Sequence, residues 1–202
     1  MNVLKDIFTR FFELGSLIAV DLPDAPYPEK EIPGFLFRPL GETDIPAVEA
    51  LCRSRTGKYF ESYRQKLLSP DKNIGFAFID AATQRIAYTR WVLLGHFFSD
   101  IIHLHKDLDK DEVLTLDSYT HPDFRFRGLH REANARMLNW LKRERGIRRV
   151  YAVERWFNPH IKKVTRSLGY RRKNIRLRYK QGSLGLEWRK LVRAARRIFG
   201  NS

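Results

Sequence analysis

Apolar residues recur at helical spacing over residues 3–18, so that positions three and four apart share one face. This spacing predicts an amphipathic helix whose other face is charged and includes Lys5, Asp6, Arg10 and Glu13. A stretch rich in proline follows and predicts an extended connector; its prolines are Pro23, Pro26, Pro28 and Pro33. We therefore expect residues 1–34 to form a helix and a connector outside the main domain.

From residue 35 the apolar pattern alternates between strand-like and helix-like segments. Strands are predicted where β-branched and aromatic residues cluster between turn signals, at 35–39, 75–80, 85–93, 113–120, 149–154 and 170–179. Helices are predicted where apolar residues recur every three or four positions, at 43–53, 58–68, 129–145 and 158–168. Between 95 and 110 the pattern is less regular, with 101–104 as a candidate strand followed by a charged loop over 106–112. The order predicts one mixed α/β domain over residues 35–180.

The chain ends in a basic segment, residues 181–202. A helix is predicted over 187–199, with an apolar face formed by Trp188, Leu191, Val192, Ala195, Ile198 and Phe199. The whole chain carries a net charge of +15, and residues 141–202 hold 20 Lys and Arg against three Asp and Glu. Such a helix is typical of one that lies on an anionic membrane, and equally of one packed on its own domain or on a partner, including a second copy in a homodimer. We favour packing on the domain or on a partner.

The composition is that of a globular protein, with 43% apolar and 13% aromatic residues. The single cysteine, Cys52, excludes an internal disulfide framework and a multi-cysteine zinc site. No apolar run reaches the length of about 18 residues that a membrane span needs. Asp6 and Glu13 interrupt the first apolar stretch, unlike a secretory signal. We expect a cytoplasmic protein, with peripheral attachment to the inner face of the membrane as the alternative.

The most informative segment runs from Asp117 to His130, where a predicted strand leads through a basic loop into a predicted helix. Arg125 and Arg127 lie in this loop, and Gly128 ends it. The first N–H groups of a helix have no internal acceptor, and the helix dipole adds positive charge at the same place. The segment is therefore a candidate pyrophosphate cradle, with an ordinary solvated loop as the alternative.

The residues Arg125-Phe-Arg-Gly128-Leu-His130 resemble the Arg/Gln-x-x-Gly-x-Gly/Ala acyl-CoA loop of the GCN5-related N-acetyltransferase (GNAT) superfamily. Pro122 precedes them at a position where that family often has proline. The segment from Asn158 to Tyr170 is similar to the family's Asn-x-x-Ala-x-x-x-Tyr-x-x-x-Gly-Phe helix, with the asparagine, the Leu-Gly pair and the closing aromatic residue in register. The resemblance covers roughly residues 35–179 and leaves the two terminal helices outside.

This resemblance implies a mixed sheet that is splayed between its fourth and fifth strands, where acyl-CoA inserts. It implies that the pantetheine arm pairs with backbone at Tyr119, Thr120 and His121, and that Asn158 contacts the pantetheine or the acceptor. The pyrophosphate would be held beside Arg125 by the amides of Phe126, Arg127, Gly128, Leu129 and His130. The implied activity is N-acyl transfer, directly from acetyl-CoA or another acyl-CoA to an amine, without a covalent enzyme intermediate.

The catalytic candidates are Asp117 on the strand before the loop, Glu154 at the end of the next strand, and Tyr170 at the end of the second motif. Either carboxylate is a candidate to take a proton from the acceptor amine. The alternative for Asp117 is a structural hydrogen-bonding role. The alternative for Glu154 is an ion pair with its basic neighbours Arg149 and Arg155.

Three positions depart from the family pattern. His130 replaces a small residue, so its side chain would crowd the phosphates or contact one by charge. Thr165 stands where the family often has a tyrosine that protonates the leaving thiolate, so Tyr170, Tyr119 or water would have to supply that proton. Tyr88 stands where many relatives have glycine.

Three further readings remain open. The first is a long-chain acyltransferase that takes its acyl group from an acidic acyl-carrier protein, which would suit the basic surface. The second is a non-catalytic module with this fold that binds CoA or a membrane. Nucleic acid as a ligand is ranked last, because net charge is its only support.

His103 and His105 lack an evident third ligand, so we expect no metal site.

Overall fold

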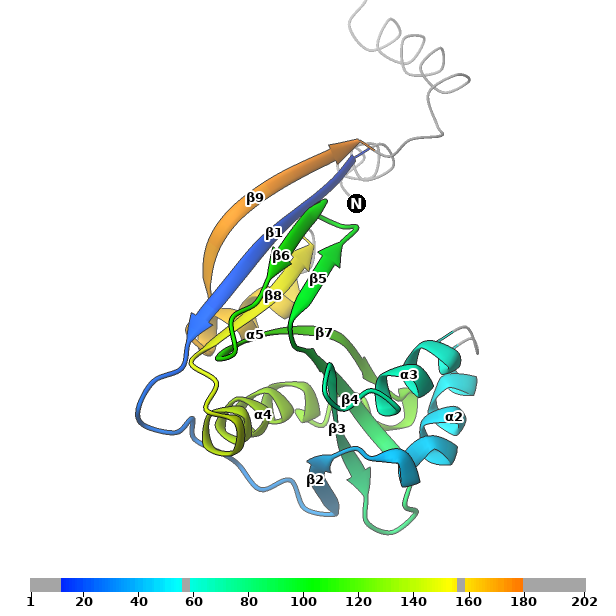
Figure 1. Cartoon of the computed structure of the whole chain (residues 1–202). Helices are drawn as coiled ribbons and strands as arrows, with labels where there is room; N and C mark the ends of the chain where they lie inside the picture. Colours follow the sequence, from blue (N-terminus) through cyan, green and yellow to red (C-terminus); the bar gives the residue numbers. More distant parts are fainter. Residues whose placement is uncertain (1–11, 56–58, 156–158, 180–202) are drawn as a thin grey trace, which may run out of the picture.

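The computed structural model describes residues 12–55, 59–155 and 159–179. Seven strands form one mixed sheet in the order β2-β3-β4-β7-β8-β1-β9 (Figure 1). β7 and β8 run parallel, and the other neighbouring strands run antiparallel. The mixed α/β class predicted from the sequence is confirmed. The strands of this sheet are β1 (Phe12–Asp21), β2 (Phe35–Pro39), β3 (Asn73–Asp80), β4 (Ile86–Leu93), β7 (Glu112–Thr120), β8 (Arg149–Arg155) and β9 (Arg171–Tyr179).

Helices cover the two faces of the sheet at different places. α4 (Leu129–Arg145) packs across one face, and its cluster of buried residues is completed by Leu168 and Tyr170, which follow α5 (Pro159–Ser167). α2 (Ile45–Ser54) and α3 (Phe60–Leu67) pack against the other face of β3 and β4. In Figure 1 the α2–α3 pair lies at one end of the sheet, and β1 and β9 lie at the other end. These helices agree with the predicted ones, and α4 has the predicted bounds.

β1 corrects the prediction of a helix over residues 3–18. Residues 12–21 form a strand that lies between β8 and β9 and is antiparallel to both. Residues 17–20 are all buried and alternate in direction: Leu17 and Ala19 join the cluster around Phe97 and Leu114, whereas the next residue in each case joins the α4 cluster. A strand places successive side chains on opposite faces, so a run of four buried residues suits a strand covered on both sides. The predicted domain boundary after residue 34 therefore separates β1 from the sheet to which it belongs.

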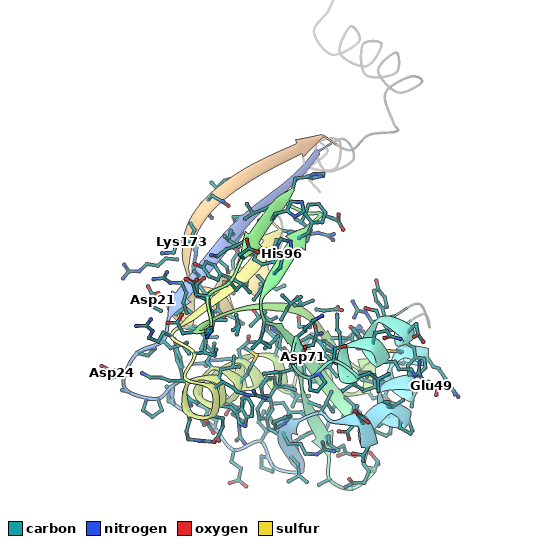
Figure 2. All side chains as sticks on the ribbon, in the orientation of Figure 1. Asp21, Asp24, Glu49, Asp71, His96 and Lys173 are labelled. Carbon is teal, nitrogen blue, oxygen red and sulfur yellow. The ribbon has the colours of Figure 1, made fainter. Side chains whose placement is uncertain are left out.

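The connector of residues 22–34 has no regular secondary structure, as predicted, but it is tied to α4. The N–H and C=O groups of Tyr27 both bond the Asn139 side chain, at 2.7 and 2.9 Å. The N–H of Lys30 donates to Glu132, at 2.8 Å. Asp24, labelled in Figure 2, accepts from Lys142 Nζ at 3.1 Å. The connector is therefore part of the surface next to the start of α4.

The region that sequence patterns described least well is a separate hairpin. β5 (His96–Ser99) and β6 (Leu104–Asp107) pair as a two-stranded antiparallel sheet. The predicted strand over 101–104 is wrong for its first three residues, which form the turn, and the predicted charged loop over 106–112 begins inside β6. The prediction failed at Ile102, an apolar residue that is typical of a strand. In the structure Ile102 lies in the turn, and its side chain is buried there, at 1% exposure.

Within the described ranges, none of the helices is both long enough and apolar enough to cross a membrane. The N-terminal part of the predicted 3–18 helix and the predicted 187–199 helix lie outside those ranges. Both stay predictions.

The interior position of β1 predicts that replacing an isoleucine on β1 destabilises the protein more than replacing one on the neighbouring strand β9. Replacing Ile18, which is 4% exposed, by alanine should lower the free energy of unfolding by about 2–4 kcal/mol, since a cavity forms under α4. Ile175→Ala on β9, where the side chain is 49% exposed, should cost less than about 1 kcal/mol. Equilibrium unfolding in urea measures both values. Equal small losses would contradict the placement of β1 inside the sheet.

Candidate functional site

The loop before α4 holds a row of free backbone donors. Gly128, at the N-cap of α4, has a φ of 76°, and Phe126 has a φ of 64°. Among the described residues, the N–H groups of residues 126–130 find no acceptor, whereas those of Arg131 and Glu132 donate to the Gly128 carbonyl. Successive N–H groups in such a conformation form a concave anion-binding site, here called the nest, and the dipole of α4 strengthens it.

The backbone conformation of the nest explains its glycine. A Cβ on Gly128 would meet no atom within 4 Å, so the positive φ, not lack of space, is what requires glycine there. Phe126 has a positive φ although it carries a large side chain, and that side chain is fully exposed. Strain of this kind in an exposed loop is typical of functional sites.

The surroundings of the nest are basic and hollow. A cavity of about 360 Å³ lies between the connector and the first turns of α4, and Gly128 is part of its wall. Lys30, Arg127 and Arg131 line it, together with two acidic residues, Glu31 and Glu132. The space next to the nest can therefore receive a ligand larger than a phosphate.

β7, which leads to the nest, has a strand partner on the β8 side for only part of its length. The ladder pairs residues 112–115 of β7 with residues 149–152 of β8, and its last pair is Thr115 with Ala152. Within the described residues, the rest of β7 is paired only with β4. This is where the sequence resemblance implies a splay between the fourth and fifth strands of the domain, and the splay itself stays a prediction.

Asp117 lies in this second half of β7 with a φ of 51°. Its carboxylate is 2.9 Å from Arg55 Nη1 and 3.5 Å from Lys66 Nζ. Burial lowers the pKa of Lys66, and Asp117 opposes that effect. The Arg55 guanidinium stacks on the rings of Tyr59 and Tyr119, at 4.0 and 5.0 Å from their centroids. Asp117 is therefore held between two cations on the α2–α3 side of the sheet.

Glu154 lies at the end of β8 and is 5% exposed. Its carboxylate accepts a hydrogen bond from the Thr165 hydroxyl on α5, at 2.9 Å. Arg149, one of its expected partners, pairs instead with Asp21 and Glu112. Among the described residues Glu154 forms no ion pair, so its charge is available to a ligand.

The backbone N–H of His130 belongs to the nest, but its side chain forms a hydrogen bond inside the fold. Its ring Nδ1 and the Tyr88 hydroxyl share a hydrogen bond of 3.0 Å. Burial, helped by the nearby Arg90, lowers the pKa of His130 to about 4. A neutral ring does not carry the charge that the expected contact with a phosphate requires. The bond also gives Tyr88, another departure from the family pattern, a partner inside the fold.

The remaining candidates lie in β7, directly after it, and on either side of α5 in the sequence. Tyr119 and Thr120 pair with β4, and the His121 N–H donates to Ala87 O at 2.9 Å, so this N–H is not free for a pantetheine arm. Tyr170 is 8% exposed, its hydroxyl has no partner, and burial raises its pKa to about 12. Such a tyrosine is a poor proton donor. Asn158 lies outside the described residues.

Sequence reasoning missed Arg55, Lys66 and Arg90. Arg55 and Lys66 meet Asp117 only through the packing of α2 and α3 on the sheet, which no local pattern encodes. Arg90 could have been found, because it is the one charged residue in the apolar strand 86–93.

No family model and no curated protein matches this sequence. Solved structures match its fold. The tandem GNAT protein from the clavulanic acid biosynthesis pathway superposes with a TM-score of 0.57 at 14% identity, covering 85% of this chain and 55% of that one. Ribosomal-protein-S5-alanine acetyltransferase from Vibrio fischeri has a TM-score of 0.54 at 14% identity, covering 71% and 82%. AAC(6′)-Iy, solved with the bisubstrate analogue CoA-S-monomethyl-acetylneamine, has a TM-score of 0.51 at 17% identity, covering 67% and 89%.

These likenesses show that the chain has the GNAT fold, as the two sequence motifs implied. The identities are low, so the likeness concerns the fold alone. The chain spans 55% of the tandem protein, that is, little more than half of its length.

The state of His130 predicts a pH dependence of stability. Its pKa is near 6.5 when the chain is unfolded and about 4 when it is folded, so the unfolded state binds the proton more tightly. The stability that is present above pH 6.5 is therefore lost as the pH falls toward 4, by about 2 kcal/mol between pH 7 and pH 5. Urea unfolding at the two pH values should show this loss in the wild type and not in His130→Gln. The same loss in both proteins would contradict a neutral, buried ring.

Proposed function

We propose that this protein is an N-acyltransferase that takes its acyl group from a coenzyme A thioester and passes it directly to an amine. The observation that carries the proposal is the nest, five free N–H groups with a basic rim at the start of α4. A diphosphate offers many acceptor oxygens and two or more negative charges to such a site. The GNAT fold and the two sequence motifs support an acyl-CoA as the source of this diphosphate. Acetyl-CoA is the simplest donor of this class.

The cavity beside the nest favours CoA over an acyl-carrier protein as the donor. A carrier protein presents its pantetheine arm on a single phosphate, without a nucleotide. The cavity of about 360 Å³ between the connector and α4 would then have no occupant, whereas the nucleotide end of CoA would extend toward Lys30 and Arg131. An acidic carrier remains the alternative donor, because the arginines around the nest also suit an acidic protein surface.

The reaction begins when the ammonium form of the acceptor loses a proton to a protein base. The amine nitrogen then attacks the thioester carbonyl carbon, the C–N bond forms and the C–S bond breaks. The second proton of the nitrogen ends on the CoA sulfur, so the products are an amide, the CoA thiol and one proton. The protein supplies positioning and proton transfer.

We assign the role of base to Glu154. It forms no ion pair with a described residue, and the Thr165 hydroxyl that bonds it stands at the position of the family's acidic tyrosine. Asp117 is less suited to this role, because Arg55 and Lys66 already occupy its carboxylate. Asp117 instead orients those two cations on the α2–α3 side, where the acceptor would approach along the rings of Tyr59 and Tyr119.

A CoA-binding module without turnover is the second candidate. It is favoured by two observations: Tyr170 is buried with a raised pKa, and Asp117 is occupied by cations. Release of the CoA thiol with any amine would exclude it. The names of two structural neighbours suggest two first amines to try, an alanine of ribosomal protein S5 and neamine.

The nest predicts the effect of a side chain at Gly128 on CoA binding. Gly128→Val should weaken the binding of CoA about tenfold or more, since the valine strains the positive φ and turns N–H donors away from the phosphates. Gly41→Val is the matched control, because Gly41 also precedes a helix with open space around it but has a φ of −126°. Isothermal titration calorimetry measures both. Undetectable binding of CoA to the wild type at millimolar concentration would overturn the proposed function.

The assignment of the base predicts a separation of binding from turnover. Glu154→Gln should lower the rate of CoA release with an accepted amine about 100-fold, because the amide takes up no proton, while the affinity for CoA stays unchanged. Glu144→Gln, on the exposed face of α4, should change neither quantity. A full rate in Glu154→Gln would remove Glu154 from the mechanism.

A further inference from the structure

β4 carries one charged residue in an otherwise uncharged strand, and this residue is buried. Arg90 is 7% exposed and points from the sheet toward the α4 side, in step with Tyr88 and Val92. Its Nη2 donates to the Thr115 hydroxyl on β7, at 2.8 Å. That hydroxyl donates in turn to the Tyr151 carbonyl, at 3.1 Å. The guanidinium is therefore fixed in place from β7.

The charge of Arg90 has no counter-charge. Among the described residues it forms no ion pair, and its Nε is buried without any hydrogen-bond acceptor. A buried cation without a partner is costly, and a buried N–H without an acceptor adds to that cost. The site that surrounds Arg90 thus lacks an anion.

A second buried donor without a partner lies beside it. The Tyr170 hydroxyl has no hydrogen-bond partner, and this residue is 8% exposed. Tyr170 belongs to the same buried cluster as Val92, which lies two residues from Arg90 on the same face of β4. The Arg90 charge and the Thr115 hydroxyl also oppose the rise that burial causes in the pKa of Tyr170. One carboxylate has acceptor sites for both the Arg90 guanidinium and the Tyr170 hydroxyl.

Arg90, Thr115 and Tyr170 lie on the side of the sheet where the acyl donor would bind, and not on the side of the acceptor amine. Thr115 is the last residue of β7 that pairs with β8, so the group lies at the inner end of the part of β7 that leads to the nest. Tyr170 and Arg90 also lie on the α4 side of the sheet, and the nest begins α4. The cluster of Asp117, by contrast, lies on the α2–α3 side.

We propose that Arg90 and Tyr170 bind the distal carboxylate of a dicarboxylic acyl group, such as a succinyl group, carried by the CoA donor. The inference rests on the proposed function, and it names the class of acyl group that the site takes. The carboxylate supplies the counter-charge to Arg90 and the acceptor for both orphaned donors. An acyl group of the same length that ends in a methyl group leaves both donors unpaired.

The test compares succinyl-CoA, butyryl-CoA and CoA by isothermal titration calorimetry with the full chain. Succinyl and butyryl groups have the same number of carbon atoms, so their difference isolates the carboxylate. The wild type should bind succinyl-CoA about tenfold or more tightly than butyryl-CoA. Tyr170→Phe should reduce this preference several-fold without lowering the stability of the free protein, since its hydroxyl has no partner there. Arg90→Met should abolish the preference.

Thr89→Val is the matched control. Thr89 also has a buried hydroxyl without a partner, next to Arg90 in β4, but its side chain points to the other face of the sheet. This variant should keep the full preference for succinyl-CoA. A preference lost in Tyr170→Phe and kept in Thr89→Val supports the proposal even if Arg90→Met fails to fold.

Two results overturn the proposal. Equal affinity of the wild type for succinyl-CoA and butyryl-CoA means that water, not a carboxylate, satisfies the buried donors. A preference that survives in Tyr170→Phe and Arg90→Met places the carboxylate elsewhere. If CoA and butyryl-CoA bind in these experiments, the proposed function stands while the inference about the acyl group fails. If none of the three ligands binds, both fail.

Discussion

The site depends on the point at which β7 and β8 stop pairing. Beyond Thr115 and Ala152, none of the described residues forms a ladder with β7 on the β8 side, and the chain continues through a strained loop into free N–H groups at the start of α4. These free donors lie in an exposed loop, where an anionic ligand can replace water as their acceptor. β1 keeps β8 in place from its other side, through a seven-residue ladder. β1, the first described strand in the sequence, thus supports β8 next to the point where β8 stops pairing with β7.

The two faces of the sheet carry different kinds of charged and polar groups. On the α4 side lie the nest, the neutral His130 and the buried Arg90, a set with donors and cations but few acceptors. On the α2–α3 side, Asp117 binds Arg55 and Lys66 among aromatic rings. An anionic donor suits the first side, and an acceptor amine would approach from the second. Glu154, near the end of β8, is a buried carboxylate that accepts a hydrogen bond from Thr165 on α5, and we assign it the proton transfer.

Local signals were sufficient for much of this arrangement. The positive φ and free N–H groups of the loop follow from Gly128 at the start of a helix, and the helical period of residues 129–145 fixed α4 itself. β1 was not predictable in the same way, because its apolar residues fit a helical period and only their burial on both faces shows a strand. The Asp117 cluster joins residues from elements distant in sequence, and the Glu154–Thr165 bond joins two consecutive elements across the fold. Such contacts depend on tertiary packing, which a single sequence pattern does not carry.

The most direct measurement of the central claim is an amide nitrogen–proton NMR titration of the full chain with CoA. Hydrogen bonds from the nest to the diphosphate should give the largest shifts at the amides of residues 126–130, followed by those of the unpaired part of β7. The remote amides of β2 and β9 should hardly move. Binding of CoA that leaves the amides of residues 126–130 unshifted would contradict the account.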